Sequence, residues 1–345
     1  MDHIGIDVHR RESQICIITE DGEVIEQRIR TTRDRYQATL GERPGARILI
    51  EASTESEWVA RLLEQQGHEV IVGDPNFAPM YGTRRRRIKN DRVDARALAD
   101  ACQSGLYKRT HRRSEDQRRR RVLIVVRDKL VKTRTSQITL LKALLRQYGI
   151  SLPSGSPETT PARVRAMDLE EWFQEQVYPL ADGCERLNEL IADADRKLAK
   201  IGQEDELVSR LQTVPGVGPV TSTAFVAAVD EAGRFRNAHQ LEAYFGLVPG
   251  EHSSGDVKRS TSITKAGSTL MRTLLIQAAM GLLRSKRPNA APLQRWYERI
   301  KQRRGAKIAR VALARRMAGV MYAMMRDSTP YDLQRLRGAT EQAAA

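Results

Sequence analysis

The sequence predicts an α/β domain followed by an all-α region, and three observations indicate this fold class. Within the first hundred residues, short apolar runs alternate with helical patterns. From residue 114 onward, apolar residues recur every three or four positions over long stretches, a spacing typical of helices. A segment rich in Pro, Ser and Gly, residues 151–161, separates two of these stretches. We expect three structured parts and a loose tail, at residues 1–106, 107–205, 206–330 and 331–345.

The N-terminal part has patterns for five strands and three helices. Apolar runs predict strands at residues 3–8, 14–18, 24–29, 48–51 and 69–72. Asp21-Gly22 predicts a hairpin turn between the second and the third strand. Apolar residues at helical spacing predict helices at residues 33–40, 55–66 and 91–103. Three meandering strands followed by alternating helices and strands is the order of the ribonuclease H fold.

The rest of the chain is predicted as helices joined by loops. Long helical patterns cover residues 114–148 and 168–201, which indicates either a coiled-coil arm or two members of an ordinary helical bundle. Shorter helices are predicted at residues 220–229, 270–283 and 307–325. The stretch 249–264, which contains Ser and Gly, is predicted as a loop.

Positive charge is the strongest compositional feature of the chain. The 345 residues include 58 Lys and Arg against 43 Asp and Glu, a net charge of +15 with a pI of about 10.0. The excess lies in two zones, residues 107–146 with a net charge of +11 and residues 253–316 with +14. A surplus of this kind favours a polyanionic partner, and two separate zones predict two nucleic-acid contacts.

Composition also excludes several classes of protein. A mean hydropathy of -0.51 excludes a membrane-spanning protein, and no run reaches the roughly 18 apolar residues that a span needs. The three cysteines cannot form a disulfide framework and lack the spacing of zinc ligands. The N-terminus carries no signal-peptide pattern, so we expect a cytoplasmic protein.

Four carboxylates stand at the ends of predicted N-terminal elements. Asp7 ends the first strand and Glu51 the fourth, while Asp91 and Asp94 share one face of a first helical turn. Each alone has an ordinary explanation, as a turn residue or as a favourable charge at a helix N-terminus. Together they predict a site for divalent cations, Mg²⁺ or Mn²⁺, of the kind that serves phosphodiester transfer. The nearby basic run suits a path for phosphate groups and consists of Arg84, Arg85, Arg86 and Arg87.

Two further motifs lie in the C-terminal half. Pro215, Gly216 and Gly218 belong to an apolar-Pro-Gly-apolar-Gly segment between helical patterns, which matches the helix-hairpin-helix motif. Backbone N–H groups of such a turn bind phosphate, and a plain helix–helix turn is the alternative. The pair Ser254-Gly255 is a phosphate-binding loop, an ordinary loop, or a nucleophile that needs a base or a metal beside it.

These motifs, in this order, resemble the DEDD transposases of the insertion-sequence 110 family over about residues 3–325. The segments that carry the resemblance are Ile-Gly-Ile-Asp7, Ile-Glu51-Ala-Ser, Asn-Asp91-Arg-Val-Asp94-Ala-Arg-Ala-Leu-Ala99, Val-Pro-Gly-Val-Gly218, Phe-Gly-Leu-Val-Pro249, Ser-Ser254-Gly and Ile-Thr-Lys-Ala-Gly267. The resemblance implies a RuvC-like N-terminal domain in which the four carboxylates above are metal ligands. It further implies a coiled-coil arm and then a transposase domain with a nucleophilic serine.

The resemblance also implies an activity and its partners. Members are Mg²⁺-dependent recombinases in which a serine links covalently to DNA, and the acidic site of a partner subunit completes the active centre. The family's serine maps best to Ser254, with Ser253 as the other assignment, and the matching Lys265 and Arg272 carry charges that suit phosphate. Donor and target DNA, an element-encoded guide RNA, and a dimer or tetramer of the chain are therefore the expected partners.

Two other functions stay open at this point. A structure-selective, Mg²⁺-dependent nuclease resembling a Holliday-junction resolvase would use the same fold and the same acids without a serine. A non-enzymatic architectural or guide-RNA-binding protein would use only the basic zones. A covalent protein–DNA adduct distinguishes the transposase from both.

Overall fold

The computed structural model of the protein describes residues 1–82, 90–254 and 257–332, with side chains described for all of these except residues 251–261. Contacts between residues divide the chain into two compact units, Met1–Arg112 and Arg113–Ala345. The first unit thus extends beyond the predicted boundary at residue 106, and the predicted arm and C-terminal part belong to the second.

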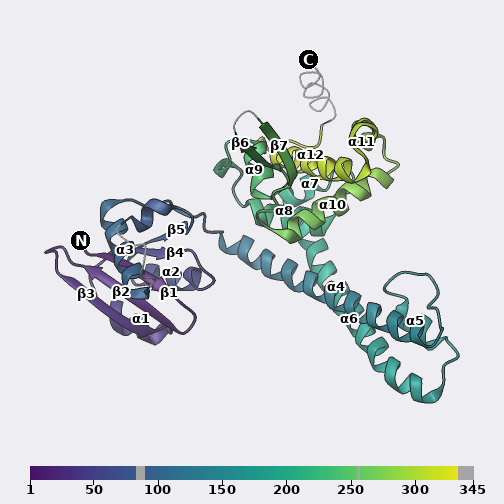
Figure 1. Ribbon diagram of the computed structural model, residues 1–345, viewed down its shortest axis with the longest axis horizontal. Helices are drawn as coiled ribbons and strands as arrows, with labels where there is room; N and C mark the ends of the chain where they lie inside the picture. The colour runs from purple at the N-terminus through teal and green to yellow at the C-terminus, as the bar shows by residue number, and fades with distance from the viewer. Residues whose placement is uncertain (83–89, 255–256, 333–345) are drawn as a thin grey trace. The chain divides into compact units, whose positions relative to one another are not determined.

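The first unit is a mixed five-stranded sheet with helices on both faces (Figure 1). The strand order is β3-β2-β1-β4-β5, with β1 antiparallel to β2 and parallel to β4. The strands are β1 His3–Val8, β2 Glu12–Ile18, β3 Val24–Arg30, β4 Arg47–Glu51 and β5 Glu69–Gly73. The helices are α1 Arg33–Leu40, α2 Ser56–Gln65, the short 3-10 helix η1 Ala78–Tyr81, and α3 Asp91–Ser104. This architecture confirms the predicted ribonuclease H-like α/β domain.

The two faces of this sheet bury different helices because side chains alternate along each strand. One face carries most of the strand isoleucines and packs against Tyr36 of α1 and Leu63 of α2. The other face packs against α3, which lies directly on the β1 backbone at Gly5. A Cβ atom at Gly5 would stand 2.2 Å from both the Ala95 carbonyl oxygen and the Ala99 nitrogen. Only glycine allows α3 to approach β1 this closely.

The second unit is mainly helical, as the sequence predicts. Its helices are α4 Glu115–Gln147, α5 Thr160–Arg165, α6 Glu171–Glu204, α7 Glu206–Leu211, α8 Pro219–Val229, the 3-10 turn η2 Ala232–Arg234, α9 Ala238–Tyr244, α10 Thr269–Arg284, the 3-10 turn η3 Pro288–Ala290, α11 Ala291–Arg304 and α12 Ala306–Arg326. The two predicted long helices, α4 and α6, pack against each other, and α5 lies beside their far end (Figure 1). None of the helices in the described segments combines the length and the apolarity needed to cross a lipid bilayer.

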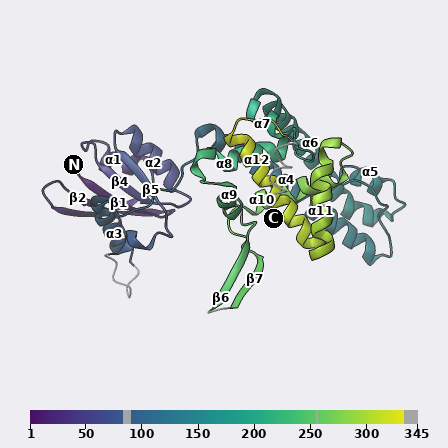
Figure 2. The same cartoon turned by 90° about the horizontal axis from the view of Figure 1, so that it is seen from above.

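One prediction for the second unit is wrong, and one helix was not predicted. The stretch predicted as a loop forms a hairpin of β6 Pro249–Ser254 and β7 Val257–Ile263, which projects from the helices (Figure 2). Its sequence lacks the alternation of apolar and polar residues from which a strand is predicted. Helix α11 was not predicted, although Leu293, Trp296 and Ile300 have helical spacing. Most of the predicted tail, from residue 333 onward, lies outside the described residues.

Candidate active site

Asp7 lies near the end of β1, on the sheet face that α3 covers. It shares this face with Gly5, two residues earlier, where the backbones of β1 and α3 touch. Because α3 begins at Asp91 and passes over Gly5 at Ala95, its first turn is brought next to Asp7. The Asp7 side chain is buried, with 7% of its surface exposed.

Two of the other predicted acids come from the first turn of α3. Asn90 caps this helix, since its side-chain oxygen accepts a hydrogen bond from the Arg92 N–H at 3.1 Å. Asp91 is partly exposed, whereas Asp94 is buried. The cap and the contact at Gly5 therefore fix both the start of the helix and its distance from the sheet.

Glu51 reaches the same edge of the sheet from a neighbouring strand. It is the last residue of β4, which runs parallel to β1. Ile50 is paired with Ile6, and Glu51 and Asp7 are the next residues on the two strands. The Tyr81 hydroxyl donates a hydrogen bond of 2.5 Å to Glu51 Oε2 and orients that carboxylate.

Asp7 is affected electrostatically by the three other predicted acids. Burial raises the pKa of Asp7 from 3.8 to about 6, and the negative charges of Asp94, Asp91 and Glu51 also raise it. His9 acts in the opposite direction. The structure thus places Asp7 and Asp91 in one close group, with Glu51 at the end of the neighbouring strand and Asp94 on the same helical turn as Asp91.

His9 is a member of this cluster that the sequence reasoning missed. Its Nε2 lies 3.3 Å from Asp7 Oδ2 and 3.5 Å from Asp91 Oδ1. The available indication was its place two residues after Asp7, because residues two apart along an extended chain face the same side. The ligand atoms of Asp7, His9 and Asp91 all lie within 4.8 Å of one another. Such an oxygen-rich group with concentrated negative charge fits a divalent cation.

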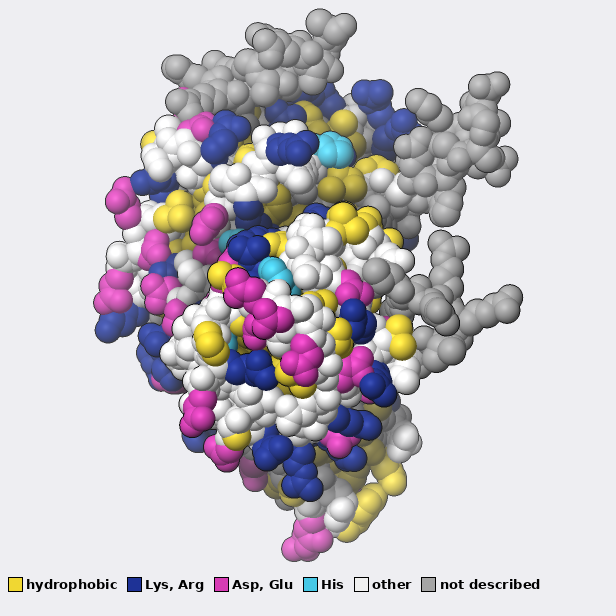
Figure 3. Space-filling model, turned by 90° about the vertical axis from the view of Figure 1, so that its left-hand side faces the viewer, with side chains coloured by type: hydrophobic (Ala, Val, Ile, Leu, Met, Phe, Trp, Pro, Cys, Tyr) yellow, Lys and Arg dark blue, Asp and Glu magenta, His cyan; other side chains and the backbone are white. Residues whose placement is uncertain are grey.

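The basic run Arg84–Arg87, predicted to guide phosphate, falls within residues 83–89 and so lies outside the described residues. On the face seen in Figure 3, Asp and Glu side chains gather beside a histidine, and Lys and Arg side chains surround them.

The turn between α7 and α8 carries the predicted phosphate-binding motif. Gly216 has a φ of 85°, and a Cβ there would lie 2.2 Å from the Ala278 carbonyl oxygen of α10, so this glycine is required by packing as well as by the turn. Pro215 is buried. Gly218 begins α8, and no described atom lies within 4 Å of a Cβ placed there.

The predicted nucleophile lies at the tip of the β6–β7 hairpin. Ser254 is the last residue of β6 and is paired with Val257, while Ser253 is paired with Lys258. The side chains of both serines are outside the described residues. The choice between them stays a prediction.

One of the two basic residues predicted to bind phosphate has a different role. Lys265 is exposed and has a φ of 56°, so its side chain is available to a ligand. Arg272 is buried, and its guanidinium donates hydrogen bonds to the carbonyl oxygens of Phe245, Ala266 and Gly267. These bonds occupy the guanidinium within the protein, which argues against a contact between Arg272 and phosphate.

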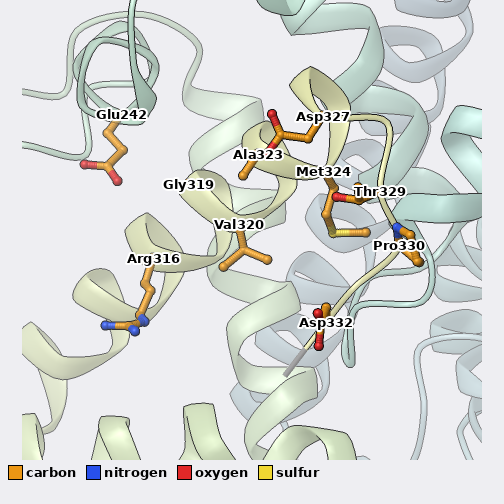
Figure 4. Close-up of a pocket in the computed structure, with 10 residues that line it drawn as sticks. All are labelled: Glu242, Arg316, Gly319, Val320, Ala323, Met324, Asp327, Thr329, Pro330 and Asp332. Atoms are coloured by element: carbon orange, nitrogen blue, oxygen red, sulfur yellow. The ribbon is translucent and has the colours of Figure 1, made fainter. Parts of the chain in front are cut away.

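A pocket of about 310 Å³ lies between α9 and α12 in the second unit (Figure 4). Glu242, Asp327 and Asp332 line it together with Arg316. Arg315 forms an ion pair with Glu242 Oε2 at 2.5 Å. The three carboxylates make this pocket unsuitable for a polyanion, and none of the predicted site residues lines it.

Comparison with known proteins agrees with this arrangement. Residues 4–150 match a family of DEDD proteins described as "Transposase", and residues 208–294 match the "Transposase IS116/IS110/IS902 family". The transposase for insertion sequence element IS1111A of Coxiella burnetii is 30% identical over 333 residues, covering 95% of this chain and 90% of the relative. A probable family 20 transposase of Pseudomonas aeruginosa is 28% identical over 337 residues, covering 96% and 98%. A putative transposase of Sinorhizobium fredii is 29% identical over 292 residues, covering 84% and 75%.

These matches confirm the resemblance that the motifs indicated, and they span both the acidic cluster and the hairpin. The chain belongs to the IS110 family of transposases, DNA-transesterifying enzymes with a DEDD N-terminal domain.

Proposed function

We propose that this transposase cuts and exchanges DNA strands through a covalent link between DNA and Ser254, with divalent cations held by the acidic cluster. The proposal depends on the grouping of Asp7, His9 and Asp91, whose ligand atoms lie within 4.8 Å of one another. Glu51 ends the strand next to that of Asp7, and Asp94 shares the first turn of α3 with Asp91. Serine at the tip of a projecting hairpin supports it, because a strand of DNA can reach that position without entering a core.

Mg²⁺ or Mn²⁺ is the cation that these residues suit, with His9 as a further ligand. When bound, such cations activate the attacking oxygen and stabilise the leaving oxygen in phosphodiester transfer. Asp7 lies at the centre of the negative charge, and Tyr81 holds Glu51 in place through its hydroxyl. The residues thereby prearrange the ligand set before a cation arrives.

Replacing His9 by Ala is expected to weaken Mn²⁺ binding by about 10-fold and Mg²⁺ binding by less, because Mg²⁺ prefers oxygen ligands more strictly. Electron paramagnetic resonance of free Mn²⁺ and calorimetry with Mg²⁺ would measure the two Kd values. His239→Ala, an exposed position on α9, is the matched control and should bind as the wild type does. Unchanged Kd values in His9→Ala would remove His9 from the ligand set.

The proposal extends to the partners of the enzyme. Donor and target DNA would meet the basic zones, with Gly218 and Lys265 among the phosphate contacts. The basic run Arg84–Arg87 would guide phosphate groups, as its sequence suggests. A guide RNA from the element's non-coding end would share these zones, since it is also a polyanion. The paired helices α4 and α6 would act as a coiled-coil arm, and two or four copies would assemble so that acids and serine come from different subunits.

The decisive experiment combines the full chain with labelled junction DNA of its element, RNA from the flanking non-coding region, and Mg²⁺. A denaturing protein gel would reveal a covalent adduct as a shifted labelled band. Ser254→Ala should reduce this band by at least about 10³-fold, the scale expected when a nucleophile is removed. Ser260→Ala on β7 is the control that should keep it.

The other outcomes of this experiment are equally informative. An adduct that is lost in Ser253→Ala and kept in Ser254→Ala would move the nucleophile by one residue. Cut DNA without an adduct would contradict the serine chemistry and favour a hydrolytic, junction-selective nuclease. Binding without cleavage would favour an architectural role.

A further inference from the structure

We propose that Arg272 is a positioning residue that fixes the direction of the β6–β7 hairpin and therefore the place of its serine. The inference rests on the proposed serine chemistry, because it concerns the segment that presents Ser254. It assigns Arg272 a part in the reaction through the backbone rather than through contact with DNA.

The hairpin joins the helical body through two short segments, residues 245–248 before β6 and 264–267 after β7, here called the hairpin root. Figure 2 shows the two strands projecting beyond the helices. Two backbone hydrogen bonds link the sides of the root. The Thr264 N–H donates to the Val248 carbonyl at 2.9 Å, and the Lys265 N–H donates to the Gly246 carbonyl at 3.2 Å.

Two glycines allow the sides of the root to touch. Gly246 has a φ of 67°, and a Cβ there would lie 2.2 Å from the Ala266 carbonyl oxygen. Gly267 has a φ of 71°, and a Cβ there would lie 2.1 Å from the Tyr244 carbonyl oxygen. The root is therefore packed backbone against backbone, with no side chain between its two sides.

Arg272 holds this arrangement from the first turns of α10. Its Nη1 donates to the Phe245 carbonyl at 3.2 Å on the entering side, and to the Ala266 and Gly267 carbonyls at 2.7 and 3.2 Å on the leaving side. Its Nη2 donates to the Thr269 hydroxyl at 3.0 Å, which orients the guanidinium plane. A single nitrogen thus joins both sides of the root to the helix.

The surroundings of Arg272 require a guanidinium in particular. The residue is 8% exposed, and in the described part of the chain the acceptors of its guanidinium are three carbonyl oxygens and a hydroxyl, with no carboxylate among them. A buried charge without an ion-pair partner is tolerated only when hydrogen-bond acceptors surround it, as the carbonyls do here. Lysine has a compact ammonium on a flexible stem and cannot keep the same planar geometry, so it is a poor substitute.

The length of the hairpin amplifies any movement at its root. Six residues of strand span roughly 20 Å, so a tilt of about 10° at the root shifts the tip by roughly 3 Å. A misplacement of about 1 Å can reduce a reaction rate by about 10²-fold. Loss of the Arg272 contacts should consequently slow the chemical step far more than it weakens DNA binding.

The test compares Arg272→Lys with the wild-type full chain in three measurements. We expect the rate of adduct formation at saturating DNA to fall by about 10²-fold while the Kd for DNA, measured with Ca²⁺ in place of Mg²⁺, changes less than about twofold. Hydrogen exchange should accelerate at the amides of Thr264 and Lys265, and the amides of α12 should keep their protection. A general loss of structure would instead raise exchange in α12 as well.

Two further variants serve as a control and as a milder test of the same contact. Arg236→Lys, an exposed arginine of the same unit that lies outside both basic zones, is the matched control and should behave as the wild type does. Thr269→Val removes only the acceptor of Nη2 at an exposed position, and should slow adduct formation by a smaller factor with the fold intact. If Arg272→Lys does not fold, Thr269→Val carries the same comparison of rate, Kd and exchange.

The failure of this inference and that of the serine chemistry are distinguishable. A wild-type adduct rate in Arg272→Lys, with faster exchange at the root, would overturn the positioning role and leave the serine chemistry intact. An equal loss of rate and of DNA affinity would also overturn it, because Arg272 would then act on binding. If Ser254→Ala and Ser253→Ala both keep the wild-type adduct, the serine chemistry fails first, and this inference fails with it.

Discussion

Replacing Asp7 by Asn is expected to abolish strand cleavage and at the same time to stabilise the first unit when divalent cations are absent. The loss of activity should reach at least about 10³-fold, since cation-assisted charge stabilisation supplies several kcal/mol of the barrier reduction. The gain in stability follows from burial, which raises the pKa of Asp7 to about 6 from 3.8. At neutral pH this ionised carboxylate opposes folding by up to roughly 3 kcal/mol, at about 1.4 kcal/mol per pKa unit.

The sign of this effect gives a pH dependence. The folded state holds the Asp7 proton more tightly than the unfolded state does. The contribution of this proton to the free energy of unfolding is therefore fully present below pH 3.8 and is lost as the pH rises through about 6. In EDTA, the wild type should therefore lose stability relative to Asp7→Asn over this interval and remain less stable at pH 8.

Urea unfolding followed through Trp58 would measure this difference. Trp58 is the single tryptophan of the first unit, so the background would carry Trp172→Phe and Trp296→Phe. Addition of Mn²⁺ should reverse the order, since a ligand that binds only the folded state stabilises it. An Asp7→Asn variant that is less stable than the wild type in EDTA at pH 8 would contradict the account of buried charge.

Gly5→Ala is expected to damage both the fold and the site through a single methyl group. The new Cβ would stand 2.2 Å from the Ala95 carbonyl oxygen, and backbone atoms cannot rotate away as a side chain can. We expect a loss of about 3 kcal/mol in the free energy of unfolding, at the upper end for overpacking. Because α3 carries Asp91 and Asp94, its displacement should also weaken Mn²⁺ binding by about 10-fold or more.

The same unfolding and Mn²⁺ titrations would measure both effects. Gly45→Ala is the matched control, because its nearest contact would be the Gly67 carbonyl oxygen at 3.2 Å and its φ is ordinary. Equal stability of Gly5→Ala and the wild type would show that α3 does not depend on this contact for its position.

The first unit could be predicted from sequence because its elements carry strong local patterns. The isoleucine runs of β1 and β4 and the cap at Asn90 are visible without a structure, so the acids at their ends could be grouped. His9 could not be assigned to the acidic cluster from the sequence as firmly as the carboxylates, because one histidine after a strand has many ordinary roles. The contact at Gly5 depends on how closely α3 packs against β1, and the local sequence does not predict this distance.

The second unit was less predictable for physical reasons. The β6–β7 hairpin has polar residues on both faces, so periodicity did not distinguish it from a loop. Arg272 was assigned to phosphate by its charge, and its true partners are carbonyl oxygens that lie far from it in sequence or follow a turn. Positive charge alone does not distinguish an arginine that contacts nucleic acid from a buried arginine that donates hydrogen bonds to backbone carbonyl oxygens.

Helix α10 makes two contacts that together fix the distance between the hairpin root and the turn before α8. Near its start Arg272 holds the hairpin root, and further along, Ala278 and Leu282 meet the backbone of Gly216 in the turn before α8. A helix is stiff over the roughly 9 to 15 Å that separate these contacts, six to ten residues at about 1.5 Å each. A phosphate bound at the start of α8 would consequently lie at a fixed distance from the hairpin root. The length of α10 would then set how much DNA lies between that phosphate and the serine hairpin.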